Sequence, residues 1–141
     1  MCRVGRLPVS LDFDAVHHYT EALDGIEVPI TLCLGRQSVE LLAKLDTGPA
    51  HCIFERKYAE MLGVYVDSGR LQRFRTVAGS FAAYQHEITV QTLGIEFSAV
   101  VFFAQDSTFN RNFLGRYGWL DRLRIAIVDY DRLLFVSPYQ S

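Results

Sequence analysis

One aspartate stands where this sequence could place a catalytic carboxylate. Asp46 ends an apolar run and is followed at once by Thr47 and Gly48. A carboxylate can act as a general base toward water or, when protonated, as a general acid toward a carbonyl oxygen. Glycine lets the chain turn sharply or lets another backbone approach closely. The three residues predict a tight loop that presents one aspartate for acid and base chemistry.

A predicted hairpin delivers this loop. Residues 39–45 alternate between apolar and more polar side chains, which is the period of a strand with one apolar face. Residues 26–34 alternate in the same way, and only residues 35–37 separate the two runs. We therefore expect an antiparallel hairpin that ends at Asp46. Pro29 indicates an edge position or a bulge.

The remaining pattern predicts a mostly β domain, residues 1–141, with two short helices. The expected strands are 9–14, a short extended piece at 51–54, a meander of 71–77, 81–92 and 95–104, and a final pair at 125–128 and 133–136. The expected helices are 55–62, closed by Gly63, and 116–123.

Composition narrows the functional classes. The chain has 141 residues, 50% of them apolar, and a formal net charge of -2, which fits an ordinary globular core. Without a basic stripe, neither nucleic acid nor a membrane is an expected partner. The apolar runs are too short to span a bilayer, and no signal segment opens the sequence, so a cytoplasmic protein is expected. Cys2, Cys33 and Cys52 are too few and too irregularly spaced for a disulfide framework or a zinc site.

Three other groups of reactive side chains have plainer interpretations. His17 and His18 are neighbours, so they diverge and suit an exposed polar patch better than a metal site. His51 and Cys52 face opposite ways for the same reason, and Cys52 reads as a small buried apolar group. Residues 67–69 repeat the acid, hydroxyl and glycine order, but the helix before them leaves no room for a supporting strand pair. We expect a plain turn there.

The order of these features resembles the retropepsin-like aspartic proteases, the single-lobed relatives of pepsin. Leu45-Asp46-Thr47-Gly48 ends a strand, Phe113-Leu114-Gly115-Arg116 follows later, and a glycine-tipped hairpin at Gly79 lies between them. The match extends over about residues 26–136. The resemblance implies a closed or partly open β-barrel of the retropepsin type, with no metal and no cofactor.

The resemblance also implies a role for each segment. Asp46 would be catalytic, with Thr47 and Gly48 holding its loop. The flap over the substrate would be Val77, Ala78, Gly79, Ser80 and Phe81, and the support beneath the active loop would be Phe113, Leu114, Gly115 and Arg116.

The sequence departs from the family pattern just after the glycine. The family usually has alanine or serine there, often followed by an acidic or polar residue, whereas this chain has Pro49 and Ala50. The loop therefore lacks a carboxylate for Arg116, which would need Glu55, Asp121 or a group from a second chain.

One aspartate does not complete the chemistry of this family. An isolated aspartate has a pKa of about 3.9 and holds no proton at neutral pH. Two carboxylates about 3 Å apart cannot both ionise and share a proton instead. Because no second motif is credible, we expect a two-fold homodimer in which the two Asp46 side chains meet. Residues 133–136 and the N-terminal segment are the expected dimer elements.

Three functions fit these observations. The main hypothesis is an aspartic endopeptidase that hydrolyses extended peptides held by the flap and the active loop. The alternative is a catalytically inactive retropepsin-like dimer that binds peptides or serves as an assembly module, which Pro49 and Ala50 suggest. In a third interpretation Asp46 is a structural turn in an unrelated β-barrel.

Overall fold

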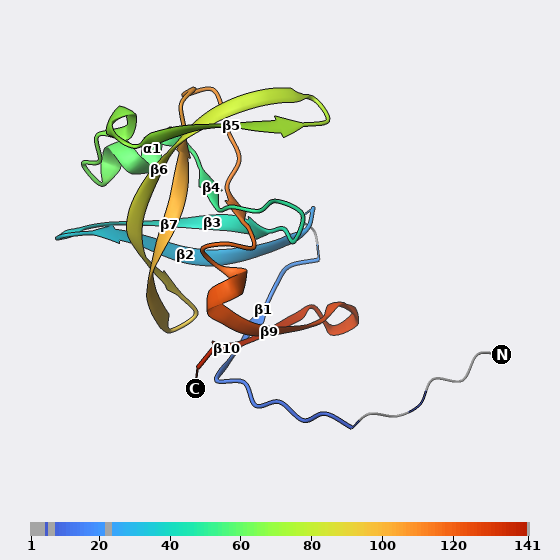
Figure 1. Cartoon of the computed structure of the whole chain (residues 1–141). Helices are drawn as coiled ribbons and strands as arrows, with labels where there is room; N and C mark the ends of the chain where they lie inside the picture. The colour runs from blue at the N-terminus through green and yellow to red at the C-terminus, as the bar shows by residue number, and fades with distance from the viewer. Residues whose placement is uncertain (1–4, 6–7, 22–23, 141) are drawn as a thin grey trace.

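The computed structural model describes residues 5, 8–21 and 24–140 and consists mostly of β-strands (Figure 1). The strands are β1 (Ala15–His18), β2 (Ile26–Leu34), β3 (Gln37–Leu45), β4 (Ile53–Phe54), β5 (Arg70–Thr76), β6 (Gly79–Thr92), β7 (Ile95–Ala104), β8 (Phe113–Leu114), β9 (Leu123–Val128) and β10 (Leu133–Pro138). The helices are α1 (Arg56–Met61) and the 3-10 helices η1 (Val66–Ser68), η2 (Leu120–Arg122) and η3 (Asp129–Asp131). Among the described residues, no helix has the length and hydropathy that crossing a membrane requires.

The strands form two sheets. The larger sheet has the order β2-β3-β8-β4-β7-β6-β5, and an additional pairing between β2 and β6 brings it round on itself. The smaller sheet has the order β1-β10-β9. This arrangement confirms the mostly β fold class and the partly open barrel.

The predicted hairpin before Asp46 is present. β2 and β3 pair antiparallel from Ile26 opposite Leu45 to Leu34 opposite Gln37, and Gly35 turns the chain with a φ of 59°. The pairing of β2 with β6 runs over residues 30–33. Pro29 lies just before that stretch, so at this position β2 pairs with β3 and not with β6. The N–H group that proline lacks is therefore not needed for a hydrogen bond to β6.

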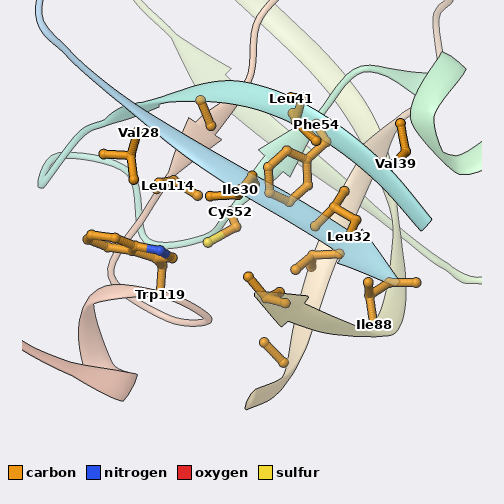
Figure 2. Close-up of a cluster of buried hydrophobic side chains, with 14 of the residues drawn as sticks. Val28, Ile30, Leu32, Val39, Leu41, Cys52, Phe54, Ile88, Leu114 and Trp119 are labelled. Atoms are coloured by element: carbon orange, nitrogen blue, oxygen red, sulfur yellow. The ribbon is translucent and has the colours of Figure 1, made fainter. Parts of the chain in front are cut away.

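The core lies between the alternating inner faces of these strands. Figure 2 shows side chains of β2 and β3 packed with Phe54, Ile88 and Leu114, with Trp119 and Cys52 beside them. Trp119 is fully buried although it comes from the segment that leads into η2. The core therefore ties the segment after β8 to the hairpin that ends at Asp46.

The helix predicted at residues 116–123 is much shorter in the structure. Residues 116–123 form a turn followed by the three residues of η2, and the chain then enters β9 directly. Gly118 has a φ of 105°, and a Cβ there would lie 3.0 Å from the carbonyl oxygen of Val100. Trp119 has φ -139° and ψ -64°, which is not helical. Close packing of this turn against β7 therefore prevents a longer helix.

The first strand also lies later than the weak alternation at 9–14 predicted. β1 pairs antiparallel with β10, with Ala15 opposite Val136 and His18 opposite Leu133. His17 is half-buried and His18 exposed, so the two neighbours diverge as expected. The start of this strand is therefore set by its pairing with β10 and not by the local alternation of apolar and polar residues.

Candidate active site

Hydrogen bonds to the segment around β8 fix the end of β3. The backbone N–H of Lys44 donates to the carbonyl oxygen of Asn112 at 2.9 Å, and that of Asp46 donates to the carbonyl oxygen of Leu114 at 3.0 Å. β8 pairs parallel with β3, with Leu114 beside Leu45. The apolar segment predicted to support the loop therefore does lie against it.

The loop that follows holds the Asp46 carboxylate. The backbone N–H of Gly48 donates to Asp46 Oδ1 at 2.9 Å, which orients a half-buried carboxylate beside the turn. A Cβ at position 48 would lie 3.2 Å from the same oxygen, so a side chain there would press on the carboxylate. Thr47 is exposed, and its hydroxyl has no hydrogen-bond partner among the described residues.

Pro49 and Ala50 are accommodated in this loop. Their carbonyl oxygens accept hydrogen bonds from the backbone N–H groups of Arg116, at 3.2 Å, and Tyr117, at 2.7 Å. These contacts use carbonyl oxygens, which proline retains, and do not need its missing N–H. The departure from the family pattern therefore leaves the loop anchored.

Gly115 allows the two segments to approach. A Cβ at this position would lie 2.3 Å from the carbonyl oxygen of His51, which no side chain tolerates. Its N–H donates to Cys52 Sγ at 3.4 Å. Gly115 is thus a position where close backbone contact requires glycine.

His51 and Cys52 do not form a catalytic pair. Cys52 is buried, and burial raises the pKa of its thiol to about 12 against the opposing hydrogen bond from Gly115. The His51 ring lies 4.8 Å from that of Phe102, 6.0 Å from Phe74 and 5.7 Å from Tyr117, measured between ring centroids. Burial lowers the pKa of the imidazole. His51 thus packs the loop after Asp46 against Phe74 of β5.

The predicted flap is the β5–β6 hairpin, which extends over the same side of the molecule as the loop after β3 (Figure 1). Thr76 Oγ1 donates to the carbonyl oxygen of Gly79 at 3.0 Å across its tip. Two residue pairs behind the tip, the rings of Phe74 and Phe81 stack with their centroids 5.2 Å apart, and Phe81 lies 4.8 Å from Phe109. A hollow opens beneath the tip, lined by residues 76–81, 109–111 and 113.

Arg116 has no carboxylate partner among the described residues. Glu55 instead contacts Lys57 at 3.7 Å and accepts a hydrogen bond from Asn112 at 2.8 Å. Asp121 accepts from the backbone of Gly118 at 3.0 Å. Glu55 and Asp121 therefore do not pair with Arg116. The third expected partner, a group from a second chain, stays a prediction. A shallow hollow opens beside it, lined by Thr47, Arg116, Tyr117, Leu120 and Asp121.

The second acid, hydroxyl and glycine run is a turn, as predicted. Residues 66–68 form η1, and the exposed Asp67 carboxylate lies 3.1 Å from Arg56 Nη1. Cys33 and Cys52 are free thiols, and Cys2 lies outside the described residues. Within the described part of the chain, no cluster of His, Cys, Asp and Glu could hold a metal ion.

Sequence reasoning missed Asn112. Its side chain accepts from the Glu55 N–H at 2.9 Å and donates to the Glu55 carboxylate at 2.8 Å, which joins the loop before β8 to the start of α1. The two residues are 57 positions apart, so no local sequence pattern indicates this link.

At the level of sequence, no protein-family model matches the chain, and no curated protein matches it either. Solved structures do match. The chain is similar to a retropepsin-like aspartic protease from Rickettsia conorii, with a TM-score of 0.62 and 18% identity over 85% of this chain and 95% of that one. It is also similar to the EIAV protease complexed with the inhibitor HBY-793, with a TM-score of 0.52 and 17% identity over 69% of this chain and 86% of that one. The chain therefore has the fold of the retropepsin-like aspartic proteases.

Proposed function

We propose that this protein is an aspartic endopeptidase that works as a two-fold homodimer, with one Asp46 from each copy. The observation that carries the proposal is the anchored loop after β3. It presents a half-buried Asp46 carboxylate, oriented by the Gly48 N–H, on the side of the molecule over which the β5–β6 hairpin extends. The two similar structures, both described as aspartic proteases, support the same reaction class.

Paired carboxylates supply the chemistry. Two Asp46 side chains in contact would share one proton, because both cannot stay ionised at close range. The ionised member takes a proton from water as the water attacks the peptide carbonyl carbon. The protonated member donates to the carbonyl oxygen, and a proton then passes to the leaving amine. The pKa values of such a reaction belong to the pair rather than to either residue.

The free edges of the small sheet suggest how two copies associate. β10 is the central strand of β1-β10-β9, so the expected dimer strand 133–136 has both edges occupied within its own chain. Among the described residues, β9 pairs only with β10 and its other edge is free. It follows η2, which lies next to the hollow lined by Thr47 and Arg116. Association through β9 would bring a second copy to the active loop and offer Thr47 and Arg116 the partners that they lack.

The test is cleavage of a peptide library by the wild type, Asp46→Asn and Asp67→Asn. Asp46→Asn keeps the shape of the side chain but cannot act as a base, so we expect turnover to fall about 100- to 10,000-fold. Asp67→Asn is the matched control, because Asp67 stands in the same local sequence but lies in an exposed turn. It should retain full activity, and thermal melting should show both variants folded.

Other outcomes separate the alternatives. Unchanged cleavage by Asp46→Asn would refute the proposed role of this residue. A wild-type protein that binds library peptides without cleaving any of them between about pH 3 and pH 8 would instead establish the inactive peptide-binding dimer.

A further inference from the structure

Two hollows adjoin at the segment that precedes β8. The hollow beneath the flap and a second one, lined by Glu27, Leu42, Lys44 and residues 110–113, share Asn110, Arg111 and Phe113. The second hollow lies along β3, whose next residue after Leu45 is Asp46. A peptide that passes beneath the flap toward Asp46 would therefore run along both hollows.

The register places two cations along this path. Lys44 lies in β3 two residues before Asp46, which is the first residue after the strand. Lys44 pairs with Phe113 in parallel register, and Arg111 precedes Phe113 by two residues and lines both hollows. We call Lys44 and Arg111 the basic wall.

The basic wall is not neutralised by its own chain. Among the described residues, neither Lys44 nor Arg111 has a carboxylate within 4.0 Å. Glu27, which faces Lys44 across the β2–β3 pair, is the one carboxylate that lines the second hollow, and no acidic residue lines the hollow beneath the flap. Two cations thus face one carboxylate along the path that leads to Asp46.

We propose that the basic wall makes this site select peptides with an aspartate or glutamate beside the scissile bond. The planar guanidinium of Arg111 offers paired N–H donors to the carboxylate of the substrate, and Lys44 adds a point charge farther along the groove. In the proposed homodimer each copy contributes one such wall, so acidic residues are favoured on both sides of the bond. This inference rests on the proposed endopeptidase function and defines its substrate class.

The test compares paired substrates. A peptide cleaved in the library screen is resynthesised with Glu or Gln on either side of the scissile bond, and kcat/KM is measured for each. We expect the Glu peptide to be preferred about 2- to 5-fold, as for exposed ion pairs, and the preference to shrink between about 50 mM and about 500 mM NaCl.

Matched variants assign the effect. Arg111→Gln should reduce the preference below about twofold, since it removes the charge and keeps a hydrogen-bonding side chain. Arg36→Gln is the control: Arg36 lies in the turn at the opposite end of the β2–β3 hairpin from Asp46, and its variant should discriminate as the wild type does. A preference that persists in Arg111→Gln would overturn the assignment to the basic wall.

Failure of this inference is distinguishable from failure of the proposed function. Equal kcat/KM for the Glu and Gln peptides would refute the charge selection and leave the protease intact. If no peptide is cleaved, binding decides: fluorescein-labelled Ala-Glu-Phe-Phe-Glu-Ala and Ala-Gln-Phe-Phe-Gln-Ala are titrated with the Asp46→Asn protein by fluorescence anisotropy. A second pair of labelled peptides, Ala-Phe-Glu-Glu-Phe-Ala and Ala-Phe-Gln-Gln-Phe-Ala, places the acidic or amide residue directly beside the central bond. Tighter binding of this Glu peptide, lost in the double variant with Arg111→Gln, would support selection by charge, and equal Kd values would overturn it.

Discussion

At the residue scale, His51 makes the stability of the fold depend on pH. Burial lowers its pKa in the folded state below the ordinary value of 6.5. The unfolded chain then binds more protons than the folded chain between these two values, so the free energy of unfolding falls as the pH drops through that window. The ring lies among Phe74, Phe102 and Tyr117, none of which supplies a carboxylate for the charged form.

We therefore expect His51→Phe to flatten this dependence. Phenylalanine keeps an aromatic ring in the cluster and cannot take up a proton. The difference in Tm between about pH 7.5 and about pH 5 should be smaller in His51→Phe than in the wild type. The exposed His18, replaced by Gln, serves as the control and should leave the difference unchanged. An equal difference in all three proteins would show that His51 does not link protonation to folding.

At the element scale, the strands and the hairpin before Asp46 were predictable, whereas the supports of the loop were only partly so. The period-two patterns of β2, β3, β6 and β7 are long and strong enough to identify each strand and its turns. The two-residue strand β8 carries no such pattern, and its place beside β3 came from resemblance. The prediction of a helix at residues 116–123 was wrong because Gly118 packs against β7, and such a tertiary contact is not visible in the local sequence. The same holds for Asn112, whose partner is distant in sequence.

The β5–β6 hairpin, which is the proposed flap, depends on one aromatic ring for its rigidity. Phe81 stacks on Phe74 within the hairpin and contacts Phe109 outside it, so it connects the flap to the loop before β8. Phe81→Ala removes both contacts, and we expect a loss of about 1–3 kcal/mol in the free energy of unfolding, below that of a fully buried phenylalanine. Urea denaturation measures this loss, and hydrogen exchange should show faster exchange of amides in β5.

A substitution at the flap tip provides the control. Val77 is exposed, so Val77→Ala should change the stability by less than about 0.5 kcal/mol. If Phe81→Ala were equally neutral, the stacked rings would not be what holds the hairpin against the loop.

At the scale of the whole molecule, the free edge of β9 is the feature that the proposed homodimer requires. An unpaired strand edge invites pairing with another chain, and charged side chains on the edge discourage it. In β9 the exposed end consists of Ile127 and Val128, at 41% and 42% exposure, and Arg124 is its one charged residue. Antiparallel pairing of β9 with its copy across a two-fold axis would extend the small sheet from one subunit into the next.

Ile127→Lys tests this arrangement because like charges facing each other across paired strands are destabilising. We expect sedimentation velocity to show the variant as a monomer at concentrations where the wild type is a dimer. Peptide cleavage should be lost together with the dimer, since each monomer holds one Asp46. Val16→Lys places the same charge on β1, at the opposite edge of the same sheet, where Val16 is 56% exposed. If Val16→Lys dissociates the dimer and Ile127→Lys does not, the two copies meet through β1, and the active loops must approach from the other edge of the sheet.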